Sequence, residues 1–94
     1  MTHTNELTLI VKPGCHLCED AEAVVTRVLA DFAAEKPGIP VLLDFKNILD
    51  DSELMARYSE EIPVLLINGK VHNYWRIDAD RLRLALDALV PGSA

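Results

Sequence analysis

Residues 7–18, with the sequence LTLIVKPGCHLC, decide the fold. The first six form a short apolar, β-branched run that is typical of a buried strand, and Pro13-Gly14 ends it. From Leu17 onward, apolar residues recur at spacings of three and four, at positions 17, 21, 24, 25, 28, 29, 32 and 33. This spacing predicts a helix with one apolar stripe. Cys15 and Cys18 therefore lie between a strand and the start of a helix.

A second strand follows this helix. Pro37-Gly38 ends the helix, and residues 39–45 are again apolar, with Pro40 confined to the start of the run. A strand, a helix and a strand of these lengths predict a right-handed crossover between two parallel strands.

A short helix is predicted next. Asp50 and Glu53 match a capping box in its Asp variant, and Leu49 and Leu54 occupy the two positions of a hydrophobic staple. We expect this helix to continue to about Tyr58.

The C-terminal third predicts a hairpin and a closing helix. Asn68-Gly69 separates two strand-like runs, residues 62–67 and 70–75, and this dipeptide is a strong hairpin signal. The last helix begins near Asp78, a suitable N-cap, and ends before Pro91-Gly92. The whole order is β-α-β-(α)-β-β-α, which predicts an α/β fold with a mixed four-stranded sheet flanked by helices.

The length and composition of the chain limit its number of domains and its partners. A chain of 94 residues predicts one domain over residues 1–94, with a core over about 6–90. Nine basic residues against 15 acidic ones give a net charge of −6, which argues against nucleic acid as a partner. The start, residues 1–6, is polar, and an 18-residue apolar run is absent from the sequence. We therefore expect a cytoplasmic monomer without a membrane partner.

Cys15 and Cys18 are the only cysteines, and in a reducing compartment such a pair is more often redox-catalytic or metal-binding than structural. Residues three apart on a helix are surface neighbours, at a separation close to what a disulfide accepts. At the helix start, Cys15 meets free backbone N–H groups that favour the thiolate, so we expect Cys15 to attack and Cys18 to resolve. Lys12 and His16 are nearby cations that can assist.

Two other interpretations of the pair remain open. A structural zinc site needs two further ligands, and only His3, His16 and His72 remain as nitrogen donors. The missing second pair of ligands argues against zinc. The alternatives that stay open are a metal or iron–sulfur carrier through the cysteine pair and a redox-silent binding module. Thiol-disulfide exchange itself needs no bound cofactor.

The cysteine motif after a strand, Lys12 upstream, Ile62-Pro63-Val64 and the Asn68-Gly69 hairpin together resemble the thioredoxin-fold glutaredoxins. The resemblance is closer to their short, glutaredoxin-like bacterial relatives and covers about residues 6–90. It implies a thiol-disulfide oxidoreductase in cell redox homeostasis. Its partners would be disulfide-containing proteins or low-molecular-weight thiols, with glutathione or a reductase as reductant.

The resemblance also implies a substrate-binding strip. In the family, the proline at the position of Pro63 is cis and faces the disulfide, and the backbone around Ile62 pairs with an extended substrate. This chain departs from the family at His16-Leu17, where glutaredoxins usually carry Pro-Tyr. It departs again at residues 75–78, where bulky side chains replace the Gly-Gly step that holds glutathione. Arg76 is a candidate partner for a substrate carboxylate in this stretch. Glutathione and another thiol remain alternative co-substrates.

Overall fold

The structure, a computed structural model, describes residues 4–91. The polar residues 1–3 and the predicted stop at Gly92 lie outside this range. The elements follow one another as β1 (Asn5–Val11), α1 (His16–Glu35), β2 (Val41–Asn47), a 3₁₀ turn (Ile48–Asp50), α2 (Ser52–Tyr58), β3 (Val64–Ile67), β4 (Lys70–Tyr74) and α3 (Ala79–Asp87). This order confirms the predicted α/β fold class.

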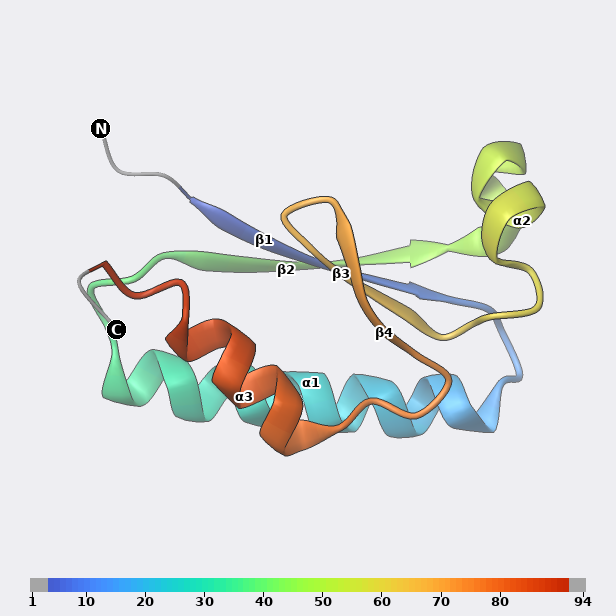
Figure 1. Cartoon of the computed structure of the whole chain (residues 1–94). Helices are drawn as coiled ribbons and strands as arrows, with labels where there is room; N and C mark the ends of the chain where they lie inside the picture. The colour runs from blue at the N-terminus through green and yellow to red at the C-terminus, as the bar shows by residue number, and fades with distance from the viewer. Residues whose placement is uncertain (1–3, 92–94) are drawn as a thin grey trace.

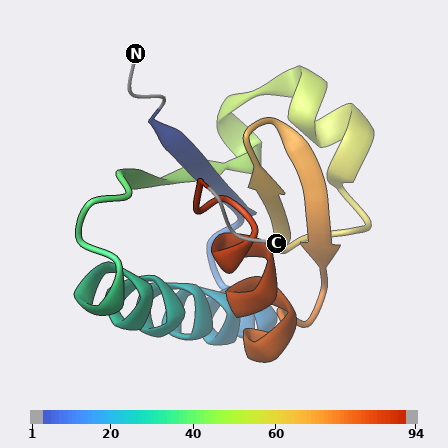
Figure 2. The ribbon, with the colours of Figure 1, turned by 60° about the vertical axis from the view of Figure 1, so that its left-hand side comes forward.

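The four strands form one mixed sheet in the order β2-β1-β3-β4. β1 pairs in parallel with β2, while β3 pairs antiparallel with both β1 and β4. Helices α1 and α3 lie together on one face, and α2 covers one end of the other face (Figure 1). Figure 2 shows the same layers after rotation, with the hairpin of β3 and β4 on the side of α2.

Successive side chains of a strand point to opposite faces of the sheet, so the apolar residues of the central strands are divided between the two faces. Leu7 and Leu9 of β1 and Leu65 of β3 pack beneath the sheet with residues of α1 and α3. Ile10 and Val64 point the other way, toward the smaller cluster beside α2. The sheet is therefore buried on both sides at the end where β1 finishes.

The long helix differs from its prediction at both ends. Its predicted stripe is buried in the middle, from Ala21 to Phe32, but Leu17 and Ala33 are exposed. At 20 residues, α1 is about 30 Å long. The seven-residue strand β1 spans only about 23 Å, so the helix ends extend past the sheet.

Strand β2 begins at Val41 rather than at the predicted Ile39, and it continues to Asn47. Pairing with β1 starts at the Asn5–Val41 register. Pro40 lies just before it and can supply only a carbonyl, which accepts the N–H of Asn5 at 3.1 Å. The prediction of the strand is therefore correct in type and wrong by two residues at each end.

The cap of α2 is Asp51 and not the predicted Asp50. The Oδ1 atom of Asp51 accepts the N–H groups of Glu53 at 2.9 Å and Leu54 at 3.2 Å. Asp50 instead ends the 3₁₀ turn, and Leu49 is 60% exposed, so the predicted staple is absent. The turn shifts the helix start by one residue.

The hairpin and the last cap follow their predictions. Asn68 and Gly69 both have positive φ, at 50° and 83°, as a two-residue turn of this kind requires. Asp78 caps α3 by accepting the N–H of Arg81 at 3.1 Å. Within residues 4–91, none of the helices is both long and apolar enough to span a membrane.

Candidate active site

Cys15 is the N-cap residue of α1. Its backbone is extended, and its Sγ atom accepts a hydrogen bond from the N–H of Cys18 at 3.1 Å. The sulfur thus takes the place of the Ser or Asp oxygen that usually accepts such an N–H at a helix start. This N–H and the positive end of the helix dipole both stabilise negative charge on the sulfur. Gly14, with φ of 74°, makes the tight turn that brings the chain from β1 to this position.

Cys18 lies one turn further into the helix and has a different environment. Its residue is 2% exposed, whereas Cys15 is half-buried, and both are free thiols. Burial and then the contact with the Cys15 side chain raise the pKa of Cys18 to about 11. A backbone hydrogen bond from Lys12 lowers that pKa by less. Cys18 is therefore a protonated thiol at neutral pH.

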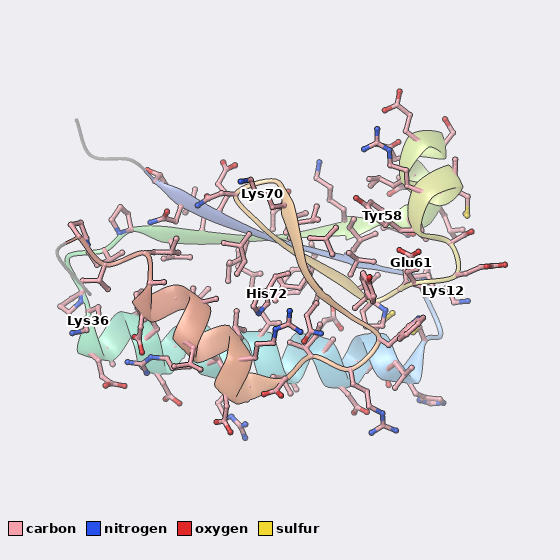
Figure 3. All side chains as sticks on the ribbon, viewed as in Figure 1. Lys12, Lys36, Tyr58, Glu61, Lys70 and His72 are labelled. Carbon is pink, nitrogen blue, oxygen red and sulfur yellow. The ribbon has the colours of Figure 1, made fainter. Side chains whose placement is uncertain are left out.

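The two cysteines open onto one cavity of about 270 Å³. Its polar wall consists of Lys12 from the β1–α1 connection, Glu19 and Glu22 from α1, and Asn47 from the end of β2. Figure 3 shows Lys12 at the end of the molecule where α1 begins. Lys12 thus lines the same cavity as both sulfurs.

His16 is not among the residues that line this cavity. Its side chain is 96% exposed, and its Nδ1 atom lies 3.4 Å from Oε2 of Glu19, an ion pair only when the histidine is protonated. The structure therefore keeps His16 beside Cys15 in the chain but directs its side chain to solvent.

Ile62 and Pro63 precede β3, and the peptide bond between them is cis. Pro63 is fully buried, and its carbonyl accepts the N–H of Trp75 at 2.8 Å. In the part of the chain that the structure describes, neither backbone group of Ile62 is hydrogen-bonded. Ile62 itself is only 8% exposed, and it belongs to the smaller apolar cluster beside α2.

Arg76 lines a second cavity, of about 290 Å³, and not the one that holds the sulfurs. Leu17, Asp20 and Trp75 are among the other residues of this cavity. Trp75 has φ of 64°, a backbone conformation that favours glycine. Its indole Nε1 donates to the carbonyl of Glu60 at 3.1 Å, which ties the β4–α3 connection to the loop before β3.

The sequence shows Glu22 as one of several acidic residues that follow the cysteines, and its place on the cavity of the sulfurs was not predicted. A residue four positions after Cys18 faces the same side of a helix, so this spacing was the available signal. Among residues 4–91, no group of three or more His, Cys, Asp or Glu side chains is arranged to hold a metal ion. His3, one of the nitrogen donors considered for zinc, lies outside the described residues.

The fold and the cysteine pair define a glutaredoxin-like protein of the thioredoxin fold. The model of one family, described as the Glutaredoxin-like domain (DUF836), matches residues 6–87. The chain belongs to this family.

Relatives of the chain agree with this assignment. A structural-genomics protein from X. campestris, XcR50, is 31% identical; the match covers 89% of this chain and 99% of that one, with a TM-score of 0.64. Protein Ne2328 from Nitrosomonas europaea is 25% identical, with a TM-score of 0.65 and coverage of 90% and 94%. The Mycobacterium tuberculosis protein Rv0508 is 26% identical over 78 residues, which are 83% of this chain and 78% of that protein.

Proposed function

We propose that this protein is a thiol-disulfide oxidoreductase, in which Cys15 is the nucleophile and Cys18 the resolving thiol. The observation that carries the proposal is the asymmetry of the two sulfurs. The Cys15 sulfur is half-buried at the start of α1 and accepts an N–H group, while the Cys18 sulfur is buried behind it. A thiolate is the attacking species in exchange, and this arrangement favours negative charge at Cys15.

The reaction has two steps. The Cys15 thiolate attacks one sulfur of a substrate disulfide, forms a mixed disulfide and releases the first substrate thiolate. Cys18 then attacks the Cys15 sulfur, forms the Cys15–Cys18 disulfide and releases the second substrate thiolate. The substrate gains two electrons and the cysteine pair loses them, so an external thiol must reduce the pair again.

The residues around the pair bind the substrate. The unpaired backbone of Ile62 pairs with an extended peptide beside Pro63. Lys12 borders the cavity of the sulfurs, His16 meets the substrate from the solvent side, and Arg76 binds a carboxylate in the neighbouring cavity. We expect the protein to act without a bound cofactor, as a monomer in the cytoplasm, on disulfides of proteins or small thiols.

Single Cys→Ser variants test the proposed roles. Cys18→Ser retains the nucleophile but cannot resolve, so it should accumulate a mixed disulfide with an oxidised peptide. Cys15→Ser retains only the buried thiol and should form almost no mixed disulfide. The measurement is intact-mass spectrometry after brief incubation. Equal and slow trapping by both variants would favour the redox-silent binding module.

The co-substrate requires a separate assay. Reduction of hydroxyethyl disulfide is measured with glutathione and, in parallel, with a thioredoxin-type reductase. Turnover with glutathione identifies glutathione as the reductant. Turnover only with the reductase identifies the reductase as the source of electrons. The equilibrium reduction potential of the Cys15–Cys18 pair is measured against glutathione buffers. A value of about −200 to −230 mV, the usual range for glutaredoxins, would support a role in thiol-disulfide exchange.

A further inference from the structure

The resolving step requires a group that removes a proton from Cys18. This inference rests on the proposed function and deepens it. Cys18 is buried as a neutral thiol, but only its thiolate can attack the Cys15 sulfur of a mixed disulfide. A nearby proton acceptor would therefore accelerate the second step without affecting the first.

The cavity of the sulfurs presents three charged side chains. Lys12, from the β1–α1 connection, is the basic residue of the three. Glu19 has a side chain that is 69% exposed and lies next to His16. Glu22 is half-buried, and it lies four residues after Cys18 on the same helix face. β2 contributes Asn47, which does not titrate.

We propose that the Glu22 carboxylate accepts the proton of the Cys18 thiol during the resolving step. The proton passes from Cys18 Sγ to a Glu22 oxygen, directly or through one water molecule. The Cys18 thiolate then forms a bond to Cys15 Sγ, and the bond between Cys15 Sγ and the substrate sulfur breaks. The departing thiolate takes up a proton from Glu22 or from water, so Glu22 returns to its ionised form.

A second observation supports this assignment. The negative charge of Glu22 is one of the causes that raise the pKa of Cys18, which requires the carboxylate to lie within electrostatic reach of that sulfur. Burial is the main reason that the pKa of Cys18 is raised, and the charge of Glu22 adds to it as the smallest of the causes. The same proximity gives the carboxylate its access to that proton when the mixed disulfide forms.

Glu22→Gln tests the proposal, with Glu19→Gln as the matched control on the same cavity. Each variant is mixed in a stopped-flow instrument with excess dithiodipyridine, a neutral aromatic disulfide. Attack by Cys15 releases one thiopyridone, and resolution by Cys18 releases another. We expect Glu22→Gln to slow only the second release, by at least about tenfold at neutral pH. Because the Glu19 side chain is 69% exposed, Glu19→Gln should slow the second release less than Glu22→Gln does.

The pH profile separates proton transfer from a structural role. The defect of Glu22→Gln should shrink as the pH rises toward the pKa of Cys18, because solvent hydroxide then ionises that thiol. An unchanged or faster second release in Glu22→Gln overturns the role of Glu22, since removal of the negative charge would then only ease ionisation. A defect of constant size across the pH range also overturns it. Failure of the first release in the parent protein would instead overturn the proposed function.

Discussion

Two identical side chains, three positions apart, acquire different chemistry from their places on one helix. Cys15 lies before the first turn, where its sulfur accepts a backbone N–H, and Cys18 lies inside the turn against the core. The sequence predicts this difference because the strand, the Pro-Gly turn and the helical stripe locate the helix start. It does not predict how deeply Cys18 is buried, since that depends on neighbours brought together by the sheet.

The raised pKa of Cys18 predicts a pH dependence of stability. The unfolded chain loses the Cys18 proton near the ordinary value of 9.0, whereas the folded chain retains it to about 11. Between these values the unfolded state binds fewer protons, so the free energy of unfolding falls as the pH rises. The contribution is complete below about pH 9 and lost above about pH 11, and it is at most about 3 kcal/mol.

Cys18→Ala provides the comparison, because it removes the titrating thiol and leaves the other alkaline groups in place. Urea unfolding of both proteins under a phosphine reductant gives the difference in free energy at each pH. The parent protein should lose stability relative to Cys18→Ala across this window. A difference that does not change with pH would show that burial does not perturb the Cys18 thiol.

At the level of the elements, the connections determine what borders the cysteines. The β4–α3 connection carries Trp75 in a backbone conformation that favours glycine, and its indole is bonded to the carbonyl of Glu60. The resemblance to glutaredoxins directs attention to this stretch, where glycines normally occur. That the backbone conformation is retained with a tryptophan is evident only from the structure, because a positive φ at a bulky residue has no local sequence signal.

Trp75→Gly tests whether this indole restricts the co-substrate. Glycine adopts the positive φ without strain and removes the side chain from the cavity beside α1. We expect a gain of several-fold in glutathione-dependent reduction of hydroxyethyl disulfide, measured by coupled NADPH oxidation. Trp75→Phe retains the bulk without the N–H donor and should show no such gain. Equal rates for all three proteins would mean that the indole does not limit access for glutathione.

Element boundaries illustrate the limit of sequence patterns. Asp50 and Asp51 are both good N-caps, and the choice between them is made by the 3₁₀ turn, whose own cap is Asn47 accepting the N–H of Leu49 at 2.9 Å. The start of β2 is similarly determined by the register with β1 and not by the apolar run itself. Local patterns therefore identify the elements, and tertiary pairing adjusts their ends.

At the scale of the whole molecule, the topology brings distant segments to one end of the sheet. β1 ends and α1 begins at the end covered by α2, as Figure 1 shows. The loop that contains Ile62 and Pro63 leads into β3, the neighbour of β1 in the sheet. The order of elements is predictable from the sequence, but the strand order β2-β1-β3-β4 is not, because each local pattern is compatible with several neighbours.

The central claim is that the fold makes Cys15 the reactive sulfur of the pair. The most direct measurement is the rate at which each cysteine of the reduced, native protein is alkylated by iodoacetamide at neutral pH, followed by peptide mass spectrometry. With Cys18 buried and its pKa near 11, we predict that Cys15 reacts at least about tenfold faster. Equal rates for the two cysteines, or faster reaction at Cys18, would contradict the account.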